Sequence, residues 1–262
     1  MDRPVNDHWN PAQYDKFKRE REQPFLDLMT LVRPAPGMRV IDLGCGTGAL
    51  TRQLHARLNA RQTVGVDRSP RMLADAQASA LPQGLTFEVG DIGAFAASDE
   101  YDLIFSNSAF HWIEDHDRLI ATLVAALKPG GQLLFQVPAM HHDPSHTAAE
   151  ALTRIEPFAS GFDGWHRPQP VLSPDVYSRL LYRHGLAAPT VHLVVYPHVL
   201  ENADAVIEWM KGTLLTEYAR HLPPDLFPAF IEAYRDRVLA AVDHATPFFF
   251  PFERILCWGQ KC

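Results

Sequence analysis

The feature that most constrains the fold is an apolar run ending in a glycine-dense turn, Val40-Ile41-Asp42-Leu43-Gly44-Cys45-Gly46-Thr47-Gly48. About twenty residues later a second apolar run ends in an acid, Asp67. Parallel sheets hold nucleosides in this way, because backbone N–H groups in the turn reach the ligand and the acid accepts hydrogen bonds from the ribose hydroxyls. The pattern therefore predicts an α/β sheet with a nucleoside site.

The residues of the turn have distinct expected tasks. Gly44, Gly46 and Gly48 are expected to form the floor of the site, because a Cβ atom there would enter the space of the ligand. Asp42, at the end of the first strand, is a short acceptor near which a ligand ammonium or a bridging water fits. Cys45 is interpreted as a small apolar filler rather than as a nucleophile.

The glycine spacing fits two cofactor classes. Gly44-x-Gly46-x-x-Ala49 is a dinucleotide fingerprint, which would indicate an NAD(P)-dependent oxidoreductase. Asp42-x-Gly44-x-Gly46-x-Gly48 resembles the first motif of class I S-adenosylmethionine-dependent methyltransferases. Later segments favour the methyltransferases, since they match that family in the right order: Ser69-Pro70 with Met72, Phe87–Ile92, Tyr101–Asn107, Ser108–Trp112 and Leu127–Leu133.

The resemblance implies a Rossmann-like, doubly wound sheet of seven strands, mostly parallel with an antiparallel last strand, and S-adenosylmethionine as the cofactor. It places Met72 beside the adenine and Asp91 at the adenine amino group, although Asp91 alternatively only caps the next helix. The complete set of expected cofactor residues is Asp42, Gly44, Cys45, Gly46, Gly48, Asp67, Arg68, Met72, Asp91, Ile92 and Asn107.

The 262 residues, 47% of them hydrophobic and 21% charged, are expected to form one elaborated methyltransferase domain, 1–262. Its parts are an N-terminal helical segment (1–37), a cofactor-binding core (38–138), a stretch of loops with one helix (139–172) and a helical insertion between strands six and seven (201–245). Strand six is expected at 190–196 and strand seven at 248–258. The insertion is expected to hold two helices, 204–215 and 224–242.

Charge and cysteine content restrict the partners. A net charge of −7 disfavours nucleic acid and anionic membrane surfaces, so the substrate is expected to be small. Three cysteines without metal spacing suggest reduced thiols. No apolar run reaches membrane-spanning length, and the first residues lack the build of a signal peptide, so a cytoplasmic protein is expected. The oligomeric state is left open, and a monomer is compatible with the sequence.

A narrower resemblance covers nearly the whole chain, namely to the trans-aconitate 2-methyltransferases. It implies transfer of a methyl group to a carboxylate of trans-aconitate or a similar small polycarboxylic acid. Two residues depart from the pattern: His111 stands where relatives often carry Gln, and Glu114 where many carry Pro. The matching segments are Trp9-Asn10-Pro11-x-x-Tyr14-x-x-Phe17, Asn107-x-x-x-x-Trp112-x-x-x-His116, Gln136-Val137-Pro138, Glu208-Trp209-x-Lys211-Gly212-Thr213 and Phe250-Pro251-Phe252-x-Arg254.

A polycarboxylate loses water on binding, so cationic side chains are expected around it. Arg21, Lys211 and Arg254 are the candidates, although a solvated helix-face charge explains Arg21 equally well. Trp112 and His111 are candidates for positioning the acid, with a structural histidine as the other interpretation of His111. Tyr14, Trp112 and Trp209 are expected to act as walls or hydrogen-bond donors, although the two tryptophans could instead be core. Trp9 is a further candidate for binding the substrate.

Two other functions stay open at this point. A class I methyltransferase could act on a carbon, a nitrogen or a hydroxyl oxygen of another small molecule, in which case His111 or His141 could serve as the base. A non-catalytic cofactor-binding protein is the more remote alternative. No metal site is expected, because His141-His142-Asp143-x-x-His146 lacks the helical spacing of hydrolytic zinc sites and is interrupted by Pro144.

Overall fold

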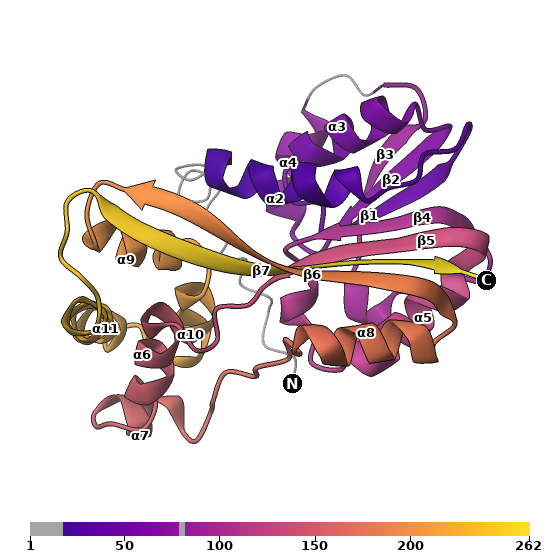
Figure 1. Ribbon diagram of the computed structural model, residues 1–262. Coiled ribbons are helices and arrows are strands. Elements are labelled where there is room, and N and C mark those ends of the chain that lie inside the picture. Colours follow the sequence, from indigo (N-terminus) through magenta and orange to yellow (C-terminus); the bar gives the residue numbers. More distant parts are fainter. Residues whose placement is uncertain (1–17, 79–81) are drawn as a thin grey trace. The chain divides into compact units, whose positions relative to one another are not determined.

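The computed structural model describes residues 18–78 and 82–262, with side chains from residue 22 onward. Within these residues the strands form one sheet in the order β3-β2-β1-β4-β5-β7-β6 (Figure 1). The pairs that β1 makes with β2 and β4, and the pairs β2–β3 and β4–β5, are parallel, whereas β7 runs antiparallel to β5. The predicted Rossmann-like sheet is confirmed. Its strands are β1 (Arg39–Leu43), β2 (Gln62–Asp67), β3 (Leu85–Val89), β4 (Tyr101–Asn107), β5 (Leu127–Pro138), β6 (Leu186–Leu200) and β7 (Phe248–Lys261).

Helices cover both faces of this sheet. Val40 points to a core shared with α2 and α3, whereas its neighbour Ile41 points to a core shared with α5 and α8. Alternation along β1 thus fills both layers, as a strand buried on both faces requires. Figure 1 shows the two layers of helices on opposite faces. The helices are α2 (Lys18–Thr30), α3 (Ala49–Leu58), α4 (Pro70–Gln77), α5 (His116–Ala126) and α8 (Pro174–Arg183).

Local sequence signals explain where these elements begin. Ser69 caps α4, since its Oγ accepts a hydrogen bond from the Met72 N–H at 3.1 Å and Pro70 occupies the first turn. The carboxylate of Asp102 in β4 accepts from the Arg39 N–H at 2.7 Å and from Lys128 Nζ at 2.8 Å. A single side chain thereby ties β4 to the starts of both neighbouring strands.

The chain divides into two compact units. The sheet unit comprises residues 19–139, 170–194 and 254–262. The helical unit contains residues 140–169 and 195–253, together with the N-terminal 1–18. The loop-rich stretch and the insertion that the sequence sets apart from the cofactor core thus fall into the same unit. Its helices are α6 (Pro144–Leu152), α7 (Phe158–Phe162), α9 (Asp204–Lys211), α10 (Leu215–His221) and α11 (Phe227–Ala241).

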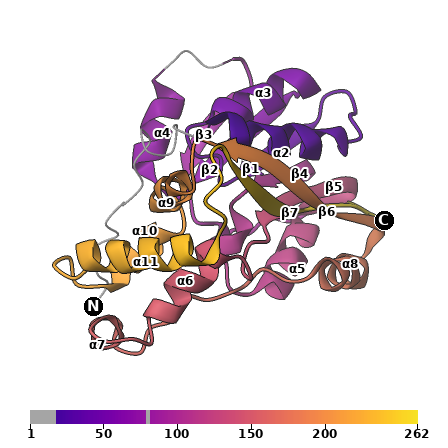
Figure 2. The ribbon, with the colours of Figure 1, turned by 60° about the vertical axis from the view of Figure 1, so that its left-hand side comes forward.

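Aromatic side chains form the centre of the helical unit. The ring of Phe230 in α11 packs against Tyr218 of α10 at 5.5 Å and against Phe162 of α7 at 5.6 Å between centroids. The Tyr234 hydroxyl donates to the Ser145 carbonyl at 2.8 Å, which joins α11 to α6, and Figure 2 shows these two helices packed together. The helical unit therefore has a core of its own, to which the insertion contributes α10 and α11.

Two expectations about the helical segments and one about a strand were wrong in detail. The insertion holds three helices rather than two, because α9 ends at Lys211 with Gly212 as its C-cap and a new helix starts at Leu215. The stretch 139–172 holds two helices, α6 and α7, instead of one. Strand β6 is longer than expected and includes two prolines, which an edge strand tolerates because its outer N–H groups need no partner.

In the part of the chain that the structure describes, no helix is both long and apolar enough to cross a bilayer.

Candidate functional site

The glycine turn after β1 is a left-handed stretch that only glycine adopts without strain. Gly44, Gly46 and Gly48 have φ values of 82°, 56° and 72°. A Cβ at Gly44 would lie 2.2 Å from the Cβ of Ala109, and one at Gly48 would lie 2.5 Å from the ring of Phe87. These two glycines are therefore required by packing within the protein, in addition to the ligand clearance that the sequence suggests.

Gly46 differs from its two neighbours. A Cβ there would meet only the end of Met72, at 3.4 Å, which is ordinary contact distance. The Gly46 N–H donates to Asp67 Oδ2 at 2.8 Å, and the Ser69 N–H donates to Asp67 Oδ1 at 2.9 Å. The carboxylate at the end of β2 is thus fixed by one backbone bond to each oxygen. A carboxylate oxygen accepts more than one hydrogen bond, so Asp67 fits the two ribose hydroxyls of a nucleoside.

Asp42 is a buried acid beneath the turn, with 4% of its surface exposed. Thr51 of α3 donates to Asp42 Oδ2 at 2.6 Å. Burial, opposed by the Thr51 bond and assisted by the negative charge of Asp67, raises the pKa of Asp42 to about 7. A cation bound near these two carboxylates would stabilise the ionised form of Asp42. S-adenosylmethionine carries a sulfonium and an ammonium group, so the charge of this site fits that cofactor.

Cys45 in the turn packs against a small apolar cluster of α4 and β3. Burial raises the pKa of its thiol, and the charges of Asp42 and Asp67 raise it further. The thiol therefore stays protonated at neutral pH and is a poor nucleophile. This supports its interpretation as an apolar filler.

The remaining predicted adenine residues follow β3 and β2. The Asp91 side chain accepts from the Gly93 N–H at 3.0 Å and caps the short helix η1 (Ile92–Ala94). Asp91 therefore does cap the next helix, which was the alternative interpretation of this residue. Asp91 is exposed, as is Arg68. Ile92 lies near the glycine turn, since a Cβ at Gly44 would be 3.5 Å from its Cδ1.

A polar network stands at the carboxyl end of β4. Gln136 of β5 donates through Nε2 to Asn107 Oδ1 at 2.8 Å and to the Ser108 hydroxyl. Ser108 has a φ of 59°, a left-handed conformation that is uncommon for a serine. Arg254 of β7 donates through Nη1 to Ser108 Oγ at 2.9 Å and to Gln136 Oε1 at 3.2 Å. Three strands thus fix the backbone turn that leaves β4.

The short helix η2 (Phe110–Trp112) follows this turn and carries both positioning candidates. The rings of His111 and Trp112 lie 4.6 Å apart at 42°, and both are partly buried. Ala109, directly before η2, lies against Gly44. The sheet unit therefore brings the glycine turn, the end of β4 and η2 together.

Comparison with known proteins adds to this geometry. Residues 34–171 match the model of a methyltransferase domain. A trans-aconitate 2-methyltransferase of Deinococcus radiodurans is 42% identical over 94% of this chain and 93% of that protein. One of Variovorax paradoxus is 36% identical over 96% and 95%. A solved phosphoethanolamine N-methyltransferase of Haemonchus contortus shares the fold with a TM-score of 0.59 at 17% identity, covering 95% of this chain and 56% of that one.

The chain belongs to the trans-aconitate 2-methyltransferase family. The predictions of a methyltransferase and of S-adenosylmethionine as its cofactor are confirmed, and the dehydrogenase interpretation of the glycine turn is set aside.

The substrate residues predicted for this methyltransferase are divided between the units. In the helical unit, Lys211 Nζ pairs with Glu208 Oε1 at 2.6 Å near the surface. Trp209, 2% exposed, packs its ring on Phe252 at 5.4 Å. Arg254 belongs to the sheet unit. Among the N-terminal candidates, Trp9 and Tyr14 lie outside the described residues, and Arg21 lies in α2 with its side chain outside the description.

The histidine-rich segment of the methyltransferase forms no grouping of three metal-binding side chains among the described residues. Asp143 caps α6 by accepting from the Ser145 N–H at 2.8 Å. His142 Nε2 lies 3.5 Å from Glu253, and burial lowers the pKa of His146 to about 3. His146 is therefore neutral at physiological pH.

Two residues of the site were not singled out from the sequence. Thr51 was missed because its bond to Asp42 depends on how α3 packs on β1. Ser108 was assigned only to the strand exit, and its bond with Arg254 joins residues 146 positions apart. Gln136 was part of a matching segment, but nothing in that segment indicates a polar network.

Proposed function

We propose that the protein transfers the methyl group of S-adenosylmethionine to a carboxylate of trans-aconitate or a similar small polycarboxylic acid. The products are a monomethyl ester and S-adenosylhomocysteine. The support is the family membership over nearly the full length of the chain and of its relatives, which carry trans-aconitate in their names. We further propose that the reaction takes place in the cytoplasm, with the three cysteines as reduced thiols.

In this proposal the glycine turn and β2 hold the cofactor. Asp67, fixed by Gly46 and Ser69, accepts the ribose hydroxyls. Asp42 supplies negative charge beneath the turn, and the buried side chain of Met72 lies at the edge of the turn. The bound cofactor supplies an electrophilic methyl group, which the protein has to keep away from water.

The acceptor needs no protein base, because a carboxylate is already ionised at neutral pH. The protein residues then have two tasks: to hold the acid in line with the methyl group and to replace the water that the acid loses. Orientation of this kind can lower a barrier by several kcal/mol. Replacement of water calls for a guanidinium, whose planar fork matches a carboxylate.

The position of Arg254 is the structural observation that carries this part of the proposal. Its side chain is 3% exposed and is held at the end of β4, beside Ser108. The acceptors Ser108 and Gln136 are neutral groups that orient the guanidinium. We assign Arg254 to a carboxylate of the acid, whereas Lys211, exposed and paired with Glu208, is expected to contribute less.

The test is production of S-adenosylhomocysteine by the purified protein with S-adenosylmethionine and a panel of trans-aconitate, cis-aconitate, citrate, isocitrate and itaconate. Mass spectrometry identifies the methyl ester. We expect turnover with trans-aconitate and close unsaturated relatives. Cofactor binding without turnover on any acid would overturn the proposed acceptor. Activity on an amine, hydroxyl or carbon acceptor that is lost in His111→Ala would then favour a methyltransferase with a protein base.

A further inference from the structure

A buried chain of hydrogen bonds leads from α8 to η2 in the sheet unit. The Tyr177 hydroxyl accepts from the Leu172 N–H at 3.3 Å and lies 2.6 Å from His116 Nδ1. His116 Nε2 lies 2.9 Å from the Phe110 carbonyl oxygen. Tyr177 and His116 are both almost fully buried, at 0% and 3% exposure, and their rings stack at 5.6 Å.

The direction of each bond follows from the chemistry of the groups. A carbonyl oxygen only accepts, so His116 Nε2 carries the proton. Burial lowers the pKa of His116, so the ring is neutral and Nδ1 is an acceptor. Tyr177 therefore donates its hydroxyl proton to Nδ1 and accepts from Leu172. The tautomer of His116 is thus fixed by its two neighbours.

The last acceptor in this series of hydrogen bonds is the Phe110 carbonyl. It lies in η2, the short helix that carries the candidate positioning residues. Phe110 is 1% exposed and packs its ring on Phe135 of β5 at 5.0 Å. Its neighbour Ala109 lies against Gly44 of the cofactor turn. The next residues along η2 are His111 and Trp112. A bond to the Phe110 carbonyl therefore restrains the backbone between the cofactor turn and these two side chains.

We propose that His116, oriented by Tyr177, is a positioning residue that holds η2 in the conformation required for methyl transfer. The expected effect on catalysis rests on the proposed function. The tautomer of His116 and its hydrogen bonds do not depend on that function. In this role His116 acts through the backbone of Phe110, and we assign it no contact with the reacting atoms. Displacement of a positioned group by about 1 Å can reduce a rate about a hundredfold.

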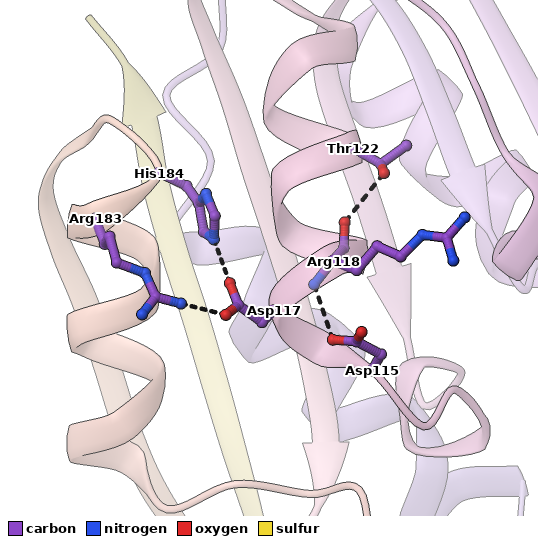
Figure 3. Close-up of polar contacts among 6 residues, drawn as sticks. All are labelled: Asp115, Asp117, Arg118, Thr122, Arg183 and His184. Carbon is purple, nitrogen blue, oxygen red and sulfur yellow. Dashed lines mark hydrogen bonds and ion pairs between the residues drawn. The ribbon is translucent and has the colours of Figure 1, made fainter.

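A second connection between the same two helices provides a matched control. Asp117, the residue after His116, accepts from Arg183 and from His184 Nε2 at 2.5 Å, both near the end of α8 (Figure 3). This cluster is largely exposed, with 51% of the Asp117 side chain accessible. It joins α5 to α8 as His116 does but makes no bond to η2. Exposed ion pairs contribute little to stability, so its loss is expected to be mild.

The experiment compares His116→Leu, His116→Gln, Tyr177→Phe and Asp117→Asn. Leucine fills a similar volume without a donor, whereas the glutamine amide can donate to the Phe110 carbonyl. We expect His116→Leu to lower kcat for trans-aconitate at least about tenfold with a nearly unchanged KM for S-adenosylmethionine. His116→Gln should recover most of the lost kcat, Tyr177→Phe should fall between the two, and Asp117→Asn should match the wild type.

A spectroscopic measurement separates this inference from the proposed function. In protein labelled with ¹⁵N-histidine, the signals that vanish in His116→Gln identify the His116 ring, and they should show a protonated Nε2 and an unprotonated Nδ1. A His116 ring protonated at Nδ1, or equal kcat losses in His116→Leu and Asp117→Asn, would overturn the positioning proposal. Absence of acid turnover in the wild type, with the expected tautomer present, would instead overturn the proposed acceptor alone.

Discussion

The two units of this molecule fix their polar side chains in different ways. In the sheet unit, side chains at the strand ends are tied to distant parts of the chain, as Asp67 is to Gly46 and Arg254 is to Ser108. In the helical unit, several ion pairs are local and near the surface, such as Lys211 with Glu208 three residues away. Under the proposed function the sheet unit holds the cofactor, so we expect charge changes in the helical unit to have little effect on cofactor binding.

The largest expected effect tests the buried charge of the sheet unit. Asp42 has a pKa raised from 3.8 to about 7, so the folded protein keeps a proton that the unfolded chain releases above about pH 4. The free energy of unfolding of the cofactor-free protein should therefore fall as pH rises from about 4 to 7. Asp42→Asn should abolish this slope and be more stable above pH 7, by at most about 4 kcal/mol.

Urea unfolding of both proteins at pH 5 and pH 8 measures this difference. The Asn variant should also bind S-adenosylmethionine more weakly, because it lacks the negative charge that a cationic ligand meets. Parallel pH dependences in the two proteins would show that Asp42 is not the group responsible.

The next prediction compares a glycine from each unit. Gly44→Ala combines positive φ with a Cβ that would lie 2.2 Å from Ala109, so it should destabilise the protein by about 2 to 3 kcal/mol. Gly164 in the helical unit also has positive φ, at 77°, but a Cβ there meets nothing within 4 Å. Gly164→Ala should cost about 1 kcal/mol. Denaturant unfolding measures both, and the double variant Gly44→Ala/Ala109→Gly should recover part of the loss unless packing is irrelevant.

Arg254 tests whether the sheet unit also provides the carboxylate clamp. Arg254→Ala should weaken acid binding by about 1.5 to 3 kcal/mol, the range for charge-assisted hydrogen bonds, and cofactor binding should change less. Calorimetry with trans-aconitate and with S-adenosylmethionine measures the two affinities separately. Arg254→Lys keeps the charge but loses the fork, so it should recover only part of the affinity. An unchanged acid affinity in Arg254→Ala would place the clamp elsewhere.

The two units also differ in how much of their structure could be predicted from the sequence. The strands of the sheet unit were predictable because glycine, proline and terminal acids mark their ends, and β4 was expected at its observed bounds, Tyr101–Asn107. Burial alternates along β7, since Phe248, Phe250 and Phe252 are buried and Phe249 is exposed. Gly212 is a helix-stop signal that ends α9, and the expected single helix 204–215 ran past it.

Contacts between residues that are far apart in the sequence could not be predicted. His116 was part of a matching segment, whereas Tyr177 lies in α8, and their bond spans 61 positions. The same holds for Arg254, whose chemistry was predicted but whose partners were not. Periodicity reports which face of an element is buried, and it carries no information on which side chains meet there.

The smallest expected effect concerns Lys211, the predicted clamp residue that lies in the helical unit. As a surface ion pair, its contact with Glu208 should contribute about 0 to 1 kcal/mol to the free energy of unfolding, so Lys211→Ala and Glu208→Gln should both unfold nearly as the wild type does. The KM for trans-aconitate separates the two possible tasks of this lysine. If it only pairs with Glu208, neither variant changes that KM. If it holds the acid, Lys211→Ala raises the KM, whereas Glu208→Gln lowers it by removing the competing carboxylate. The second result would assign Lys211 a part in acid recognition.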